Sequence, residues 1–581
     1  MNPLRRALSA LLALSLLCAC VTVSRAAPAA DNTPIIILPG YTADQLFLRP
    51  DADDREVVWD LDFSAVGTEI LRELPRLFFG LVQWTLTGRD ALFVEGFRRA
   101  AARVLGIFAV NPDGTSAQPV GPYPTRAADC SAAALRDQPY AGLIRNGSFV
   151  RKFEQQVGAD RVFVLQFDWR APAGESTRQL RTFIQEVKAL TGSDTVRLFG
   201  SSYGGLLAGV YLYEYAEEGD VSRAVLEFPA LGGTSMVPPL LTGEEFALNT
   251  ETLTRFVQSY MGTELELDPL TRWLCLDFLS GLATDLLQTA LLPVVKTWGS
   301  LWDLVPAASY DRVKAKVLAP GEHYAWETDS DRLHHVIMPG MGAALRAAEA
   351  AGTEIRIVAN TGSLHLLGTD GVNSDGLLDV ALTTGAAALP LGKHGLSPLP
   401  DPVCADNSHR HLSPGQDIDA AQAYLPESTW FVQGQFHGMS PADPYAFALT
   451  ADLMLRPELR TVWDDPAYPQ FGLCRQPSEN IAVALGPENG WIPAAGAALR
   501  IDNLSAKYDL QLLRVCAEGT GLIFQVDTSR RAGPGESLSV PLAGALNAAP
   551  GAYIPLKVTY LQYTEGVPVI KTKIFDATAP S

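Results

Sequence analysis

Short apolar runs alternate with amphipathic stretches along most of the chain. Residues 34–38 (PIIIL) form a continuous apolar run that ends at Pro39 and Gly40, which is typical of a strand buried on both faces of a parallel sheet. Similar runs occupy residues 161–167, 195–199, 224–228, 354–358 and 429–433. Residues 177–190 carry apolar side chains at helical spacing and stop at Gly192. Strands that alternate with helices predict an α/β fold with a doubly wound, mostly parallel sheet.

Two apolar segments interrupt this alternation, at about residues 51–146 and 243–319. The first contains RLFFGLVQW and ALFVEGF, and the second contains LCLDFLSGLATDLLQTALLPVV. They are either extra core helices or helical cap and lid insertions over a site for an apolar substrate. We assign both to a single α/β domain that spans residues 32–456.

After residue 456 the pattern changes to short alternating runs between Gly, Pro and Asn turns. Such runs occupy residues 482–485, 509–516, 521–526 and 554–563. This spacing predicts an all-β sandwich domain over residues 457–581. It contains no histidine, and we interpret it as an accessory domain.

The first residues have the pattern of a targeting segment. Arg5 and Arg6 precede an apolar run at 7–23, and small residues follow at 24–27. This predicts a signal peptide over residues 1–27 and a secreted or extracytoplasmic protein. A lipoprotein signal is the alternative, in which Cys20 carries a lipid anchor.

The net charge of the chain limits the classes of partner that it can bind. The chain has 64 acidic and 45 basic residues among 581, a net charge of −19. A nucleic-acid partner is excluded, because such binding depends on Lys and Arg that neutralise phosphates. The acidic chain would not bind anionic lipid through electrostatic attraction either. Contact with a membrane or lipoprotein surface would therefore use apolar cap helices.

Cysteines do not form a disulfide framework. Five remain beyond the signal: Cys130, Cys275, Cys404, Cys474 and Cys516. An odd, sparse set in a long exported chain argues against such a framework, although Cys474 and Cys516 could pair. Because no Cys-x-x-Cys spacing occurs, we expect no metal and no cofactor.

The third predicted strand runs into Gly-Ser-Ser-Tyr-Gly at residues 200–204, and an apolar helix follows. A strand, a tight turn with flanking glycines and a helix are the context of a nucleophile elbow. Ser202, the middle serine, is the candidate nucleophile, and Ser201 is a neighbour without a catalytic role.

A serine hydroxyl needs a histidine base, which in this fold comes late in the chain. Of the eight histidines, only His437 directly follows a late predicted strand. The other seven stand before the fifth strand or in loops: His323, His334, His335, His365, His394, His409 and His411. His437 is therefore the candidate base.

The orienting carboxylate is expected in the loop after the fifth strand. Asp375, in Ser-Asp-Gly, is our candidate, because the Asp-Gly pair allows a sharp turn that aims the carboxylate at an imidazole. Asp370 and Asp379 are rivals, and an ordinary Asp-Gly turn is the structural alternative.

Two backbone amides should form an oxyanion hole. One is that of Tyr203, the residue after the nucleophile. The other belongs to the loop after the first strand and comes from Thr42 or Tyr41.

Six further segments occur in a consistent order: ILPGYTADQL at 37–46, FDWR at 167–170, GGT at 232–234, LTG at 241–243, LWDLVP at 301–306 and SDG at 374–376. Together they resemble one family, the lecithin:cholesterol acyltransferase and lysosomal phospholipase A group of α/β-hydrolases. The resemblance covers roughly residues 34–455. It implies an α/β-hydrolase fold, a serine esterase, and a role for Asp168 and Arg170 beside the nucleophile; a buried ion pair is the alternative for those two residues.

We therefore expect a secreted serine esterase that hydrolyses lipid acyl esters, most simply a phospholipid or a glyceride. One alternative is an O-acyltransferase that moves the acyl group to a lipid alcohol such as a sterol. Another is an inactive exported binding or adhesion protein that uses the β-sandwich. The elbow reads GSSYG where that family has AHSMG, and the sandwich has no counterpart there.

Overall fold

The computed structural model describes most of the chain after the first 31 residues. The described residues are 32–59, 106–136, 147–244, 292–367, 371–406, 408–474, 481–485, 498–503, 505, 508–517, 522–542, 553–564 and 567–578. The predicted signal peptide and Cys20 lie outside them.

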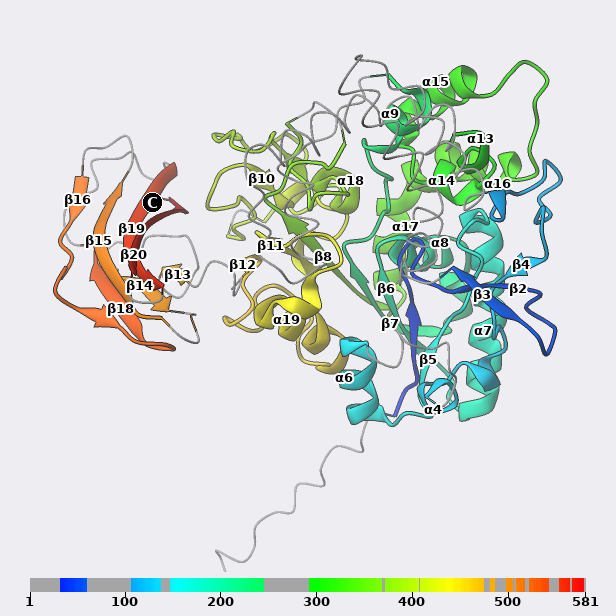
Figure 1. Cartoon of the computed structure of the whole chain (residues 1–581), viewed down its shortest axis with the longest axis horizontal. Coiled ribbons are helices and arrows are strands. Elements are labelled where there is room, and N and C mark those ends of the chain that lie inside the picture. Colours follow the sequence, from blue (N-terminus) through cyan, green and yellow to red (C-terminus); the bar gives the residue numbers. More distant parts are fainter. Residues whose placement is uncertain are drawn as a thin grey trace, which may run out of the picture.

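A seven-stranded sheet forms the centre of the larger domain (Figure 1). All its pairings are parallel, in the order β12-β11-β8-β7-β6-β1-β5. The strands are β1 (Ile35–Leu38), β5 (Val162–Val164), β6 (Val196–Ser201), β7 (Val221–Glu227), β8 (Glu354–Thr361), β11 (Thr429–Gln433) and β12 (Phe471–Leu473). The first six confirm the predicted strands. The parallel sheet confirms what the pattern of apolar runs predicted. Together with its helices it is an α/β-hydrolase fold, as the resemblance implied.

Helices cover both faces of the sheet. The helices α7 (Ala173–Thr191), α8 (Tyr203–Tyr215) and α17 (Met338–Ala350) share one core with it, and α6 (Ser148–Val157) and α19 (Pro444–Leu455) share the other. Successive side chains of β1 enter opposite cores, Ile36 and Leu38 the first, Ile35 and Ile37 the second. This two-sided burial explains why the strands are continuous apolar runs.

Helix ends follow the local sequence. Gly192, predicted as a stop, adopts the left-handed conformation with φ 67° after α7, where a side chain would be strained. At the start of α19 the Asp443 side chain accepts hydrogen bonds from the amides of Tyr445 and Ala446, as an N-cap does. In the described residues no helix combines the length and the apolar composition needed to span a membrane.

The two insertions are described only at their edges. In the first, β3 (Glu56–Trp59) and β4 (Val120–Gly121) form a small antiparallel sheet with β2 (Leu46–Leu48), which precedes the insertion, and η1 (Ala127–Asp129) and α4 (Ala132–Leu135) follow. From the second come α13 (Leu292–Val295), α14 (Gly299–Asp303) and α15 (Ala307–Val317), after α9 (Val237–Thr242). The predicted cap helices at 60–105, 137–146 and 245–291 lie outside the described residues.

The remaining elements of this domain are short. They are η2 (Ala216–Glu218), α16 (Glu327–Arg332), the π-helix η5 (Leu333–Ile337), α18 (Val380–Thr384), β9 (Ala387–Ala388), β10 (Ile418–Asp419), η6 (Ala420–Gln422), η7 (Pro426–Ser428) and η8 (Ser440–Ala442). Strands β9 and β10 pair with each other outside the main sheet.

The C-terminal region is built from antiparallel strands, as predicted. One sheet contains β13 (Ile481–Leu485), β14 (Ala498–Asn503) and β18 (Ser537–Pro541). The other contains β15 (Leu510–Ala517), β16 (Leu522–Phe524), β17 (Arg531–Ala532), β19 (Tyr553–Thr564) and β20 (Val567–Thr578). Residues from both sheets, among them Leu499, Ile501, Val515 and Val558, form one hydrophobic core, which is the architecture of a β-sandwich.

The central sheet extends past the expected boundary at residue 456. Strand β12 pairs with β11 through Phe431 and Phe471, and Leu459, Val462 and Tyr468 belong to the core under α19. Residues up to about 474 therefore belong to the α/β domain. The run at 471–473 is too short to produce a strand signal in the sequence.

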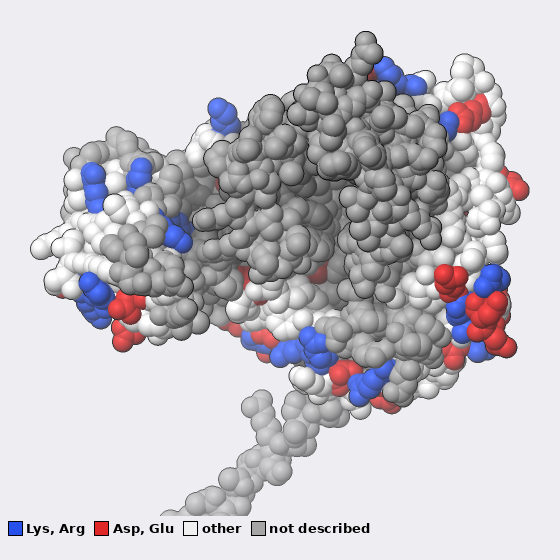
Figure 2. All heavy atoms as spheres, viewed as in Figure 1, with Lys and Arg blue, Asp and Glu red and all other residues white. Residues whose placement is uncertain are grey.

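Described charged residues on the face in Figure 2 are interspersed, with blue and red side chains next to each other. Among the described residues, surface ion pairs include Arg178 with Asp329 and Arg181 with Glu218. This mixture matches the absence of a basic excess in the composition.

Candidate active site

Ser202 stands on a strained turn between β6 and α8. Its backbone angles are φ 56° and ψ −118°, a combination that non-glycine residues rarely adopt. A Cβ atom on Gly204 would lie 2.0 Å from the carbonyl oxygen of Leu38, so only glycine lets the helix approach β1 this closely. Both features belong to a nucleophile elbow.

Three predicted site residues meet although 235 positions separate the first from the last. His437 Nε2 lies 3.0 Å from Ser202 Oγ, and His437 Nδ1 lies 2.7 Å from Asp375 Oδ2. The second carboxylate oxygen of Asp375 accepts hydrogen bonds from the amides of Leu377 and Leu378, at 2.9 and 2.7 Å. These bonds fix the carboxylate and leave Oδ2 for the imidazole.

Close packing holds the loop of Asp375 against that of His437. The His437 amide donates to the Asp375 carbonyl oxygen at 2.9 Å. Gly376 has φ +100°, and a Cβ atom there would lie 2.2 Å from the Phe436 ring. The glycine of the Asp-Gly pair is thus required for both the turn and the contact. Of the rival acids, Asp370 lies outside the described residues.

Asp379, the other rival, has different partners. It accepts hydrogen bonds from the hydroxyl and the amide of Ser235, at 2.8 and 2.9 Å, and lies 3.5 Å from His365 Nε2. The preceding Thr234 donates its hydroxyl to the Leu377 carbonyl oxygen at 2.6 Å. The Gly-Gly-Thr segment therefore anchors the loop of Asp375 through Thr234.

The other histidines have partners away from Ser202. His334 is buried between the carbonyl oxygens of Ser330 and Val305, and burial lowers its pKa to about 4. His323, His335, His365 and His394 lie beside Glu327, Asp311, Asp379 and the Gly415 carbonyl oxygen, and His409 and His411 lie next to each other. Among the described histidines, His437 is thus the one placed at Ser202.

The loop after β1 lies against the elbow, where the oxyanion hole is expected. A Cβ atom on Gly40 would lie 3.8 Å from Ser202 Oγ. Thr42 has φ 59°, and its carbonyl oxygen accepts a 2.8 Å hydrogen bond from the Trp59 indole. Tyr203 opens α8, so its amide is one of the helix N–H groups that have no acceptor four residues earlier.

Asp168 and Arg170 form a bidentate ion pair, with distances of 2.9 and 2.6 Å. The Arg170 side chain is 1% exposed. Its remaining N–H groups donate to the carbonyl oxygens of Phe108 and Val120 and to the Ser116 hydroxyl. These contacts join the segment after β5 to the first insertion, which gives the ion pair a structural role.

Glu227 is a site residue that the sequence analysis missed. It ends β7, is 2% exposed and accepts a 2.6 Å hydrogen bond from the Ser201 hydroxyl. Burial raises its pKa to about 7, although the hydrogen bond from Ser201 and the nearby His437 both lower it. The feature of the sequence that could have revealed it is a glutamate inside the apolar run AVLEF, because a buried charge without a partner is costly in free energy.

Asp303, in the LWDLVP segment, is a second buried carboxyl group that contacts the elbow helix. Its Oδ2 accepts hydrogen bonds from the Tyr203 hydroxyl at 2.9 Å and from the Ala173 amide at 2.6 Å. Burial raises the pKa of Asp303 to about 7. This carboxyl group connects the second insertion to the first residue of the elbow helix.

The suggested pairing of Cys474 with Cys516 is wrong, because both are free thiols. Cys474 is buried beside β12, and its Sγ donates to Gln435 Oε1 at 2.8 Å. Cys516 lies on β15 of the sandwich. The two cysteines therefore belong to different domains.

Comparisons with known proteins give no close relative. No family model matches the chain, and no curated protein matches it. Phospholipase PlaB from Legionella pneumophila aligns with a TM-score of 0.23 and 11% identity over 78% of this chain and 89% of that one. A meta-cleavage product hydrolase from Pseudomonas fluorescens IP01 gives 0.17 and 11% over 36% and 57%, and a Nitrososphaera gargenis carboxylesterase structure gives 0.17 and 12% over 36% and 67%.

At these TM-scores the likeness carries no argument about activity. The fold is assigned from the chain's own sheet order and elbow. The chemistry is inferred from the side chains that the fold brings together.

Proposed function

We propose that the chain is a serine hydrolase that cleaves lipid acyl esters. The observation that carries this proposal is the continuous hydrogen-bonded series Asp375–His437–Ser202, with the serine on a strained elbow. A nucleophile, a base at hydrogen-bond distance and a third group that orients the base are the parts that acyl transfer through a covalent intermediate requires.

In the first half-reaction Ser202 Oγ attacks the ester carbonyl carbon while His437 Nε2 takes the hydroxyl proton. Asp375 holds the Nδ1–H tautomer and stabilises the imidazolium that forms. The amides of Tyr203 and Thr42 stabilise the negative charge that develops on the carbonyl oxygen. His437 then gives its proton to the leaving alcohol, and the acyl group stays on Ser202.

In the second half-reaction water takes the place of the alcohol. His437 removes a proton from the water as it attacks the acyl carbon, and then returns a proton to Ser202 Oγ. The products are a free carboxylic acid and the regenerated serine.

Two features support a lipid as the acyl donor. The chain resembles the lecithin:cholesterol acyltransferase and lysosomal phospholipase A family over segments that include the acid loop and its Gly-Gly-Thr anchor. It also carries two long apolar insertions, one before and one after the elbow in the sequence. We propose a phospholipid or a glyceride, met at a membrane or lipoprotein surface through apolar cap helices.

We also propose that the protein is exported through its first 27 residues and uses the β-sandwich as an accessory domain. The pattern of Arg5, Arg6 and the apolar run that follows supports export. Fractionation of expressing cells would test this, since a chain truncated before residue 28 should stay inside the cell.

The substrate is tested with vesicles of phospholipid or emulsions of diglyceride, each with and without sterol. The wild type should release free fatty acid from at least one of them, and Ser202→Ala should not. Acyl transfer to the sterol as the main product would replace hydrolysis by the acyltransferase reaction. An absence of turnover on all of them would contradict the lipid assignment.

A further inference from the structure

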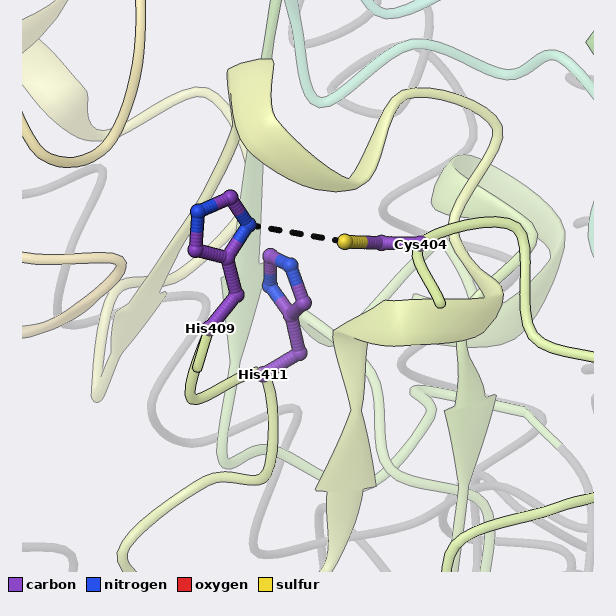
Figure 3. A group of neighbouring side chains, drawn as sticks. All are labelled: Cys404, His409 and His411. Carbon is purple, nitrogen blue, oxygen red and sulfur yellow. Dashed lines mark hydrogen bonds between the residues drawn. The ribbon is translucent and has the colours of Figure 1, made fainter. Parts of the chain in front are cut away.

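A second group of chemically reactive side chains lies in the loop between β9 and β10, away from the elbow. It consists of Cys404, His409 and His411, whose ligand atoms all lie within 4.8 Å of one another. In Figure 3 the two imidazoles stand side by side, and Cys404 faces His409 across a hydrogen bond. Its spacing in the sequence is Cys-x4-His-x-His and not Cys-x-x-Cys, so the absence of Cys-x-x-Cys did not exclude it.

His411 is oriented as a metal ligand would be. It is 4% exposed, and its Nδ1 lies 2.9 Å from Gln470 Oε1. The Gln470 amide nitrogen donates to the carbonyl oxygens of Pro426 and Thr429, so Oε1 must be the acceptor from His411. The proton is therefore on Nδ1, and Nε2 presents a lone pair.

That lone pair has no partner in the described part of the chain, although Nε2 is buried. A buried polar atom without a hydrogen bond costs about 1–3 kcal/mol, so such an atom needs an explanation. A cation bound between His411 Nε2, His409 and Cys404 supplies one.

The distance between Cys404 and His409 suits a tetrahedral metal, and His411 lies within 4.8 Å of both. Cys404 Sγ lies 3.5 Å from His409 Nδ1. With Zn–S near 2.3 Å and Zn–N near 2.0–2.1 Å, the sulfur and nitrogen ligands of one zinc ion are about 3.6 Å apart. Glu427 Oε1 lies 3.4 Å from the same imidazole nitrogen and is the carboxylate next to this position.

Backbone contacts hold the three residues in place without the metal. The amides of Val403 and Cys404 both donate to the Ala421 carbonyl oxygen, and the Ala420 amide donates to that of His411. The ring of Trp463 packs against both imidazoles, at centroid distances of 5.1 and 5.7 Å. The donors are thus gathered on a supported loop with an aromatic wall.

We propose that Cys404, His409 and His411 bind one Zn²⁺ ion, with the fourth coordination position taken by Glu427 or water. One thiolate and two imidazoles suit zinc and not Mg²⁺ or Ca²⁺, which prefer oxygen. Binding releases the thiol proton of Cys404 to solvent and leaves both imidazoles neutral.

The ion would have a structural role. Gln470 joins His411 to the beginning of β11, whereas His437 follows the end of that strand. A strand of this length spans about 16 Å. On its other side the loop reaches the acid segment, where Asn373 donates to Asp417 at 3.1 Å. Zinc would therefore clamp the loop that supports Asp375 and would take no part in ester cleavage.

Metal content of the purified full-length chain tests the proposal. After dialysis against Zn²⁺ and then against metal-free buffer, the wild type should retain one zinc ion per chain. Replacement by Co²⁺ should give the absorption of a tetrahedral site together with a thiolate-to-cobalt charge-transfer band. A wild type that retains no zinc would overturn the proposal.

Variants locate the ion. Cys404→Ser should lower zinc affinity by about 100-fold or more and remove the charge-transfer band, because the thiolate is lost. Cys516→Ser, a free cysteine of similar exposure in the sandwich, and His335→Gln are the matched controls and should bind as the wild type does. Equal affinity in Cys404→Ser and Cys516→Ser would contradict the assignment.

A variant of a second ligand tests the site if Cys404→Ser does not fold. His409 is 27% exposed, so His409→Gln should fold and still lose zinc. Its thermal midpoint should no longer rise when Zn²⁺ is added, whereas that of the wild type should. A zinc-dependent rise that persists in His409→Gln would also overturn the site. Neither readout depends on esterase activity, so this proposal and the proposed function can fail separately.

Discussion

Glu227 accepts a 2.6 Å hydrogen bond from Ser201, the residue before the nucleophile. The carboxyl group is 2% exposed, and burial raises its pKa from 4.5 to about 7. The residue before the nucleophile is therefore hydrogen-bonded to a group that changes charge near neutral pH.

Glu227 should make the folded chain less stable as the pH rises from about 4.5 to about 7. In this range the folded state keeps a proton that the unfolded chain has released, so stability falls with pH at a total cost of up to roughly 3 kcal/mol. Glu227→Gln cannot ionise. It should melt at a higher temperature than the wild type at about pH 8 and at nearly the same temperature at about pH 4. The same difference at both pH values would show that Glu227 does not titrate in this way.

Asp375→Asn should lower kcat/KM by about 10⁴-fold, because the amide no longer holds the Nδ1–H tautomer of His437. The matched control is Asp379→Asn. Asp379 contacts Ser235 and His365 and not His437. Asp379→Asn should therefore lower kcat/KM by less than tenfold. Kinetics on a soluble short-chain ester would show the contrast, and a reversed order of the two effects would make Asp379 the acid.

Gly376→Ala should disrupt the acid loop. The added Cβ would lie 2.2 Å from the Phe436 ring at φ +100°, so the turn or the ring next to His437 must move. Gly392→Ala is the matched control, because Gly392 has φ +75° and nothing within 4 Å of the added atom. It should cost only about 1 kcal/mol of folding free energy. We expect Gly376→Ala to lose most of its esterase activity and Gly392→Ala to keep it; equal losses would refute this account of the turn.

Arg170→Met should destabilise the fold by roughly 3–5 kcal/mol, because it leaves Asp168 without its ion-pair partner and the carbonyl oxygens of Phe108 and Val120 without their donors. Arg181→Met removes an ion pair with Glu218 in which Arg181 is 50% exposed, and should cost at most about 1 kcal/mol. Urea unfolding of both variants measures the difference. Similar values for the two would argue against a structural role for Arg170.

The sequence predicted the parts of the fold that depend on local pattern. Buried parallel strands are continuous apolar runs, so β1, β6 and β8 were visible, and the elbow was visible because its glycines are required by close packing. The order of strand, serine, acid and histidine then pointed to Ser202, Asp375 and His437, which the structure brings within hydrogen-bond distance.

What the sequence did not reveal depends on contacts between distant segments. Strand β12 has three residues and is defined only by its pairing with β11. Glu227 and Asp303 became recognisable only when burial and their partners were known. Cys404, His409 and His411 matched no familiar spacing, and the orientation of His411 depends on Gln470, 59 residues away.

Labelling with a fluorophosphonate tests the central claim most directly, because the probe reacts only with a serine that a neighbouring base activates. The wild type should be labelled once, at Ser202, and Ser202→Ala should not be labelled. Ser235→Ala is the control, since Ser235 also lies beside a histidine and an aspartate, and it should be labelled like the wild type. Labelling that persists in Ser202→Ala, or that disappears in Ser235→Ala alone, would contradict the assignment of Ser202 as the nucleophile.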